Sequence, residues 1–337
     1  MRSAWLALLV ALVTAPNAAA QDVAAFYAGK TIRLVVGVDV GSGYDVNARL
    51  LARHLGAHIP GHPAFVVQNQ PGAGSVTMTS QLYASGPFDG TVIGAAFAGM
   101  PTIPLLAPGG SRFDPVKLIW LGNTNRETHV TYVWHSAPVQ SLEEAKGREL
   151  IMGAQAPGSS QVDFPLVADA LLGFKFKVVP GYQSTSKINL ALESGEVQGT
   201  IAAWTTLKTL SSAWLKDRKI KIIAQWALRP NPELPGVPNV LDAAATAEQR
   251  DALRLVLARL DVGRPFFLPP NVPPDRVAAL RAAFDATMAD ADYRAEAEKL
   301  NIDIDPLTGA ELAALVAQVA QTPPETVARV RAALERK

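Results

Sequence analysis

The sequence contains no cysteine among its 337 residues. A disulfide framework, a thiolate zinc site and a cysteine nucleophile are therefore excluded. No stretch reaches the roughly 18 uninterrupted apolar residues that a membrane-spanning helix needs. The formal net charge is only +1, which argues against a nucleic-acid-binding protein, because such proteins usually carry a strongly basic face.

Sequence motifs of two common enzyme groups are also missing. No G-x-x-x-x-G-K-[ST] segment exists, so a P-loop is excluded. The segment G-A-G-S-V-T at 72–77 has the first two glycines of the dinucleotide fingerprint, but Thr77 replaces the third. The G-x-S-x-G elbow of serine hydrolases is absent. A triad stays open as an alternative if the distant His129 or His135 approaches a loop serine.

The first twenty residues have the pattern of a secretory signal peptide. Arg2 precedes an apolar segment at 4–13, which is too short to span a bilayer. Three small residues at 18–20 then predict cleavage near Ala20. We therefore expect an exported protein whose mature chain begins at Gln21.

Hydrophobic residues make up 49% of the chain and charged residues 18%, so the chain can bury a substantial core in two domains. Strand patterns at 31–38, 65–67 and 91–96 alternate with helical patterns, which predicts an open α/β sheet. A second α/β block begins near residue 128. The helical block after it has too few strands for a domain of its own, so we expect the chain to return to the first domain. The predicted division is 1–20 signal peptide, 21–127 plus 258–337 lobe 1, and 128–257 lobe 2.

Loops rich in Gly, Ser and Thr follow the predicted strands in both blocks, at 39–45, 70–75, 97–102, 156–161 and 180–186. In open α/β sheets ligands bind beyond the carboxyl ends of the strands. Backbone N–H groups at helix N-termini favour anions there. Two such sets of loops predict a cleft that holds a carboxylate from both sides. Asp45 is expected to cap the helix that follows, and Asp39 to receive a donor group of the ligand.

Three histidines, His54, His58 and His62, are spaced by four residues. The first two share one helix face, a spacing that can bind metal. His62 lies beyond Pro60, where the helix has ended, and no carboxylate is nearby in sequence. We therefore expect a solvated helix face and no metal site.

Segments along almost the whole mature chain resemble the Bug-type periplasmic solute receptors of tripartite tricarboxylate transporters. The matching segments are KTIRLVV at 30–36, NQPGAG at 69–74, PFDGT at 87–91, GY at 181–182, GEV at 195–197, LPGVP at 234–238 and PPNVP at 269–273. Their order and spacing together carry the resemblance.

The resemblance implies a two-lobed Venus-flytrap receptor with a mixed sheet in each lobe. Such a receptor is not an enzyme and needs no cofactor. It would act in the periplasm as a monomer, close around a small carboxylate and deliver it to the large and small membrane subunits of a permease. The ligand-binding residues that it implies are Asp39, Val40, Gly41, Ser42, Gly43, Gly72, Ala73, Gly74, Phe97, Ala98, Gly158, Ser159, Ser160, Tyr182, Gln183, Ser184 and Trp204.

Some positions depart from the family pattern. The first loop has Asp39 and Val40 where the family usually has P-G-G, and Gln198 replaces a frequent Asp. These changes allow a ligand with an added hydrogen-bonding group, or an aromatic ligand stacked on Tyr182 or Trp204. Two alternatives stay open: an exported hydrolase or lyase that uses a cleft Ser or His, and a receptor whose closed form binds a sensor protein.

Overall fold

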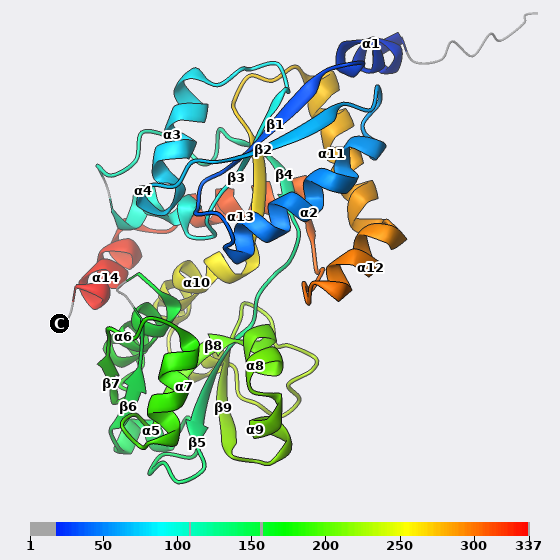
Figure 1. The fold of residues 1–337 in the computed structure, drawn as a ribbon. Helices are drawn as coiled ribbons and strands as arrows, with labels where there is room; N and C mark the ends of the chain where they lie inside the picture. The colour runs from blue at the N-terminus through cyan, green and yellow to red at the C-terminus, as the bar shows by residue number, and fades with distance from the viewer. Residues whose placement is uncertain (1–17, 108, 156–157, 336–337) are drawn as a thin grey trace, which may run out of the picture.

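The computed structural model describes residues 18–107, 109–155 and 158–335. Within these ranges the strands form two mixed sheets, which lie one above the other as two lobes (Figure 1). This confirms the predicted two-lobed α/β fold. Residues 1–17 of the predicted signal peptide lie outside the described residues. No helix in the described ranges is long and apolar enough to cross a membrane.

The sheet of the first lobe has the strand order β11-β4-β10-β3-β1-β2. Strand β1 pairs in parallel with β2 and β3, whereas β10 is antiparallel to β3 and β4. The predicted early strands and the short extended segment near 265 are confirmed. Strand β4, which lies inside the sheet, was not predicted. The bounds are β1 Thr31–Val36, β2 Ala64–Asn69, β3 Val92–Ala95, β4 Ile119–Asn123, β10 Pro265–Leu268 and β11 Leu307–Thr308.

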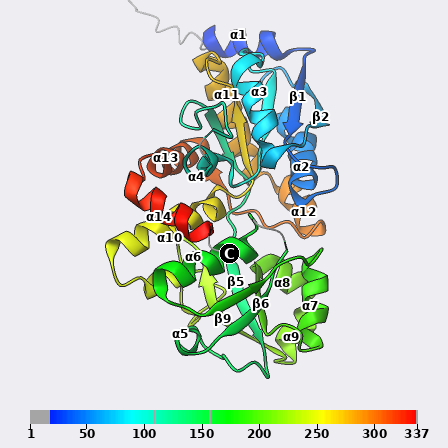
Figure 2. The same cartoon turned by 90° about the vertical axis from the view of Figure 1, so that its left-hand side faces the viewer.

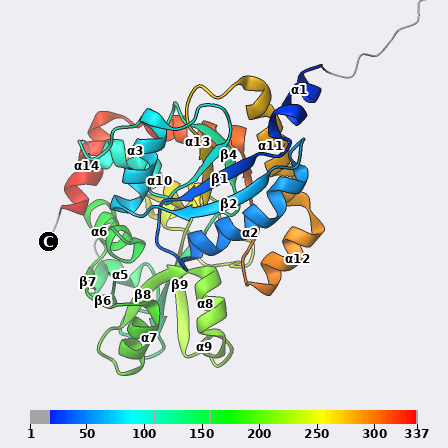
Figure 3. The ribbon, with the colours of Figure 1, turned by 45° about the horizontal axis from the view of Figure 1, so that its top comes forward.

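Helices cover both faces of this sheet, as the tilted view shows (Figure 3). Leu34 on β1 belongs to the core formed with helices α2 and α11, and its neighbour Val35 belongs to the core formed with α3 and α13. A strand buried on both faces carries a continuous apolar run, as 34–36 does. The helices of this lobe are α1 Ala18–Tyr27, α2 Gly43–His58, α3 Val76–Ser85, α4 Ile103–Leu106, α11 Pro274–Ala289, α12 Ala291–Lys299 and α13 Gly309–Ala320.

The sheet of the second lobe has the order β7-β6-β8-β5-β9. Met152 on β6 packs on one face with Phe164 of α6, and Tyr132 on β5 packs on the other with Ile188 of α7. The bounds are β5 His129–Trp134, β6 Leu150–Gly153, β7 Phe176–Val179, β8 Gly199–Ala203, β9 Ile220–Trp226, α5 Glu144–Gly147, α6 Ser160–Leu172, α7 Thr185–Glu193, α8 Trp204–Leu210 and α9 Ser212–Lys216.

Helices α10 (Ala247–Val262) and α14 (Pro324–Leu334) lie at the junction of the lobes (Figure 2). Val327 and Val330 of α14 share a core with Phe164 of the second lobe. The C-terminal helix therefore packs on the second lobe, although the chain has returned to the first. The division of the chain at 127/128 and 257/258 stays a prediction, and its second boundary falls inside α10.

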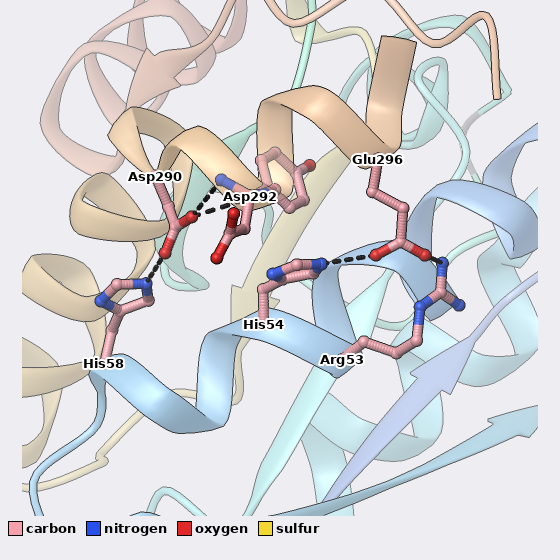
Figure 4. Close-up of polar contacts among 7 residues, drawn as sticks. Arg53, His54, His58, Asp290, Asp292 and Glu296 are labelled. Carbon is pink, nitrogen blue, oxygen red and sulfur yellow. Dashed lines mark hydrogen bonds and ion pairs between the residues drawn. The ribbon is translucent and has the colours of Figure 1, made fainter. Parts of the chain in front are cut away.

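The face of α2 that carries His54 and His58 packs against α12 (Figure 4). Glu296 accepts from Arg53 Nη2 at 2.6 Å and lies 2.6 Å from His54 Nε2. His58 Nε2 is 2.8 Å from Asp290, which also caps α12. The expected solvated face is therefore wrong for these two histidines, because their partners come from more than 200 positions later in the chain.

We expect Glu296→Gln to lower the melting temperature at pH 7. The loss in the free energy of unfolding should be less than about 1 kcal/mol, because the contacts of Glu296 with Arg53 and His54 are partly exposed to solvent. Hydrogen bonds from His54 and Arg53 lower the pKa of Glu296, against a smaller opposing effect of burial. A depressed carboxyl pKa contributes stability above its unfolded value, near pH 4, and loses it as the pH falls through the folded value. The difference from wild type should therefore shrink below about pH 4.

Thermal melts of wild type, Glu296→Gln and Glu298→Gln from pH 7 to pH 3 test this. Glu298 is exposed on the same helix and serves as the matched control. A Glu296→Gln defect that does not change with pH would contradict the electrostatic explanation.

Candidate functional site

The loop after β1 is built around the carboxylate of Asp45. Ser42 caps α2 by accepting from the Asp45 N–H, and Asp45 accepts from the Gly41 N–H at 2.8 Å. Burial acts to raise the pKa of Asp45, but hydrogen bonds from Arg49, Gly41 and Asn69 outweigh it and hold the pKa below its usual value. Ser42, not Asp45, is thus the cap residue. Asp45 is buried, and its carboxylate stabilises the loop by accepting the hydrogen bond from the Gly41 N–H.

The outer residues of this loop face away from the core. Asp39, Gly41 and Gly43 are exposed, and Val40 is 72% exposed. Because Val40 is still mostly hydrated, a ligand or the other lobe could gain free energy by burying it. The loop thus offers an apolar tip beside the Asp39 carboxylate.

The loop from Gly72 to Ser75 holds consecutive residues at positive φ. Gly72, Ala73, Gly74 and Ser75 have φ of 153°, 46°, 60° and 74°. For Ala and Ser this backbone region is strained, and such strain concentrates at functional sites. Ser75 is buried, and its hydroxyl donates to Gly37 O at 3.1 Å while accepting from the Phe97 N–H at 2.9 Å. Ser75 therefore fixes this strained loop to two strand ends.

The residues after β3 are held by neighbours in the same lobe. The Phe97 N–H already donates to Ser75, and the Ala98 N–H donates to the Tyr44 hydroxyl at 3.2 Å. The Phe97 ring is half-buried and lies 5.5 Å from the Tyr44 ring. Phe97 thus presents an aromatic surface, while both amides have intramolecular acceptors.

In the second lobe an arginine of α10 anchors the loop before α6. Arg259 donates to Gly158 O at 3.1 Å and to Asp163 at 2.6 Å, and the Gly158 N–H donates back to Asp163. Ser159 is the N-cap residue of α6, but its hydroxyl makes no cap hydrogen bond. Its Oγ is buried without a partner in the part of the chain that the structure describes.

The neighbouring Ser160 belongs to a chain of polar contacts that sequence analysis left open. Its Oγ is 2.9 Å from His129 Nδ1, and His129 Nε2 is 3.2 Å from Glu127. Glu127 also accepts from Arg264 Nη2 at 3.3 Å. Burial acts to raise the pKa of Glu127, but the hydrogen bond from His129 and the charge of Arg264 lower it to about 2. We call Ser160, His129, Glu127 and Arg264 the polar relay.

The remaining predicted residues of the second lobe make local contacts. Tyr182 donates its hydroxyl to Glu196 at 2.6 Å, and Trp204 donates its indole N–H to Glu233 at 2.5 Å. Both rings are half-buried and pack against the core of the second lobe that contains Tyr132 and Ile188. Their position in a cleft wall stays a prediction. Ser184 caps α7, and Gln183 is exposed.

A cavity of about 1210 Å³ brings predicted residues of three loops and both lobes together. Gly74 and Phe97 line it from the first lobe and Gly158 from the second. Apolar side chains such as Ile103 and Leu166 line much of the remainder, together with the Arg259–Asp163 pair. The described residues include no cluster of three or more side chains able to hold a metal ion.

No family model matches the sequence. A UPF0065 protein encoded in the gbd 5′ region of Cupriavidus necator is 25% identical over 283 residues, covering 81% of this chain and 79% of that protein. Among solved structures, a TctC solute-binding protein from Polaromonas matches with a TM-score of 0.71 and 20% identity, over 91% of this chain and 98% of that one.

Two further solved structures share the fold. The periplasmic binding protein BugD matches with a TM-score of 0.60 and 21% identity, over 91% of this chain and 98% of that one. MatC of Rhodopseudomonas palustris, solved with bound malate, matches with a TM-score of 0.59 and 20% identity. The match covers 91% of this chain and 99% of that one. The chain resembles the Bug-type and TctC solute-binding proteins, as its sequence motifs indicate.

We expect Ser75→Ala to lower the stability by about 1–3 kcal/mol, because it leaves the Phe97 N–H without its acceptor. Thermal or urea unfolding measures this loss. Ser85→Ala is the matched control, since Ser85 is an exposed serine at the end of the same helix and should change stability by less than about 0.5 kcal/mol. Equal effects of the two substitutions would show that Ser75 is not the anchor of the loop.

Proposed function

We propose that this chain is a periplasmic solute receptor of the Bug type, which binds a small carboxylate between its lobes and delivers it to a tripartite tricarboxylate-type permease. The observation that carries the proposal is the cavity lined by Gly74, Phe97 and Gly158 from opposite lobes. The likeness to solute-binding proteins, one of them with bound malate, supports it.

The electrostatics of the site favour a receptor that uses neutral donors. Arg259 and Arg264 are close to the predicted loops, but each is paired with a buried or half-buried carboxylate. The Ser159 hydroxyl has no hydrogen-bond partner within the part of the chain that the structure describes. A carboxylate held by neutral groups binds and leaves without breaking an ion pair, as delivery to a permease requires.

A thermal-shift screen of residues 21–337 against mono-, di- and tricarboxylates tests the proposal. A ligand at a hundred times its Kd adds about 2.7 kcal/mol, which raises the melting temperature by several degrees in a chain of this size. We expect one class of acid to give such a shift. No shift with any acid would contradict the carboxylate assignment.

Gly74→Val should abolish the shift. Gly74 has φ of 60°, in a region where a β-branched residue is strained, yet a Cβ there would meet no atom within 4 Å. We therefore expect a loss of at most about 1–2 kcal/mol in stability together with a loss of acid binding. Gly109→Val, at another open positive-φ glycine outside the predicted loops, is the control that should retain binding.

A hydrolase is the second candidate, because the Ser160–His129–Glu127 contacts have the order of a nucleophile, a base and an orienting carboxylate. We place it second because Glu127 is also bound by Arg264, an arrangement that serves to hold the lobes equally well. Reaction with a fluorophosphonate probe and release of nitrophenol from nitrophenyl acetate distinguish the two candidates. We expect neither reaction. Labelling that disappears in Ser160→Ala but persists in Ser159→Ala would establish the hydrolase.

A further inference from the structure

The two serines at the start of α6 differ in what they can offer a solute. Ser159 Oγ has no partner in the described residues, whereas Ser160 Oγ lies 2.9 Å from His129 Nδ1. A hydroxyl has a single proton to donate and two lone pairs that accept. The role of Ser160 therefore depends on which of the two groups, hydroxyl or imidazole, supplies the proton between them.

The other end of the relay determines that direction. Glu127 is treated as ionised because the guanidinium of Arg264 lies 3.3 Å from its carboxylate and forms an ion pair with it. An ionised carboxylate only accepts hydrogen bonds. His129 Nε2, 3.2 Å from Glu127 Oε2, must therefore carry a proton. In the neutral ring the other nitrogen, Nδ1, is then an acceptor, and Ser160 donates to it.

The groups around the ring favour this arrangement. Glu127 precedes His129 on the same segment, and Arg264 reaches Glu127 from the segment before β10. Helix α6 contributes Ser160 and the ring of Phe164, 5.9 Å from the His129 ring. The flanking strands pair His129 with Ala203 and Trp226, neither of which titrates.

Arg259 and Asp163 form a second ion pair close to Phe164. Arg259 of α10 stacks on the Phe164 ring at 5.1 Å and is paired with Asp163. Near Arg264, the Tyr44 ring lies 5.5 Å from the guanidinium. Both arginines thus have a carboxylate partner, and Glu127 is the carboxylate in contact with the imidazole.

A Ser160 that has donated its proton to His129 can still accept a hydrogen bond but has no proton for a carboxylate. Gly158, two residues before it, lines the cavity between the lobes. We propose that Ser160, oriented by His129, selects carboxylates that also carry a hydrogen-bond donor, namely hydroxy or amino acids, while Ser159 donates to the carboxylate. This inference rests on the proposed function.

The direct test compares acids that differ only in the donor group. Succinate, malate and aspartate share a four-carbon dicarboxylate, and propionate, lactate and alanine form a second set. Titration calorimetry at pH 8 should show that a hydroxy or amino member binds about tenfold or more tightly than its unsubstituted parent, the ratio that about 1.4 kcal/mol produces. Ser160→Ala should remove this preference. Ser159→Ala should weaken the members of a set by similar factors and keep the preference.

A His129→Phe variant tests whether His129 orients Ser160. Phe keeps an aromatic ring at this position but has no nitrogen to accept from Ser160, so the preference should fall toward that of Ser160→Ala. An unchanged preference would show that His129 does not orient the hydroxyl.

A measurement without ligand tests the premise. Ring nitrogen resonances of ¹⁵N-labelled chain at pH 8, assigned by their loss in His129→Gln, should show the proton on Nε2. A proton on Nδ1 alone overturns the proposal. Binding of the acids without preference overturns the selectivity and leaves the receptor function intact. Failure of the acids to bind at all overturns both.

Discussion

Two of the segments that join the lobes, the one before β5 and the one between α10 and β10, lie side by side, and the arrangement of the site depends on their contact. The Glu127 N–H donates to Leu260 O at 2.8 Å, and the Glu127 carboxylate accepts from Arg264 at 3.3 Å. Gly263 has φ of 56°, and a Cβ there would lie 1.8 Å from Asn125 O. Only glycine permits this approach. The close contact in turn brings Arg264 to Glu127 and sets the start of β5.

From this contact between the two segments, a series of hydrogen bonds and ion pairs extends into each lobe. On one side, Arg264 lies over the Tyr44 ring, and the Tyr44 hydroxyl accepts from the Ala98 N–H. On the other side, Glu127 holds His129, which holds Ser160. The loops of the two lobes that line the cleft are thus connected through paired charges. The charges of Arg259 and Arg264 are thus each balanced by a carboxylate of the same chain, Asp163 and Glu127.

The sequence predicts well those parts of the fold that depend on local pattern. The apolar run at 34–36 marks a buried strand and the helical pattern after it marks α2, and both are present, although Ser42 caps the helix in place of the predicted Asp45. Strand β4 was missed because its five residues, IWLGN, have no alternation and its neighbours β10 and β11 come from the end of the chain. Its place is determined by long-range pairing, which no local window contains.

The same limit applies to the site. The loops at 72–75 and 158–160 are visible as glycine and serine clusters, but the partners of their side chains are not. Ser160 and His129 are 31 positions apart, and Glu127 and Arg264 are 137 apart. The glycine and serine clusters in the sequence therefore identify groups that can hydrogen-bond to an anion. The fold determines which of these groups already have an intramolecular partner. Two adjacent serines at the start of α6 differ in the structure because His129, at the start of β5, contacts Ser160, whereas Ser159 Oγ has no partner among the described residues.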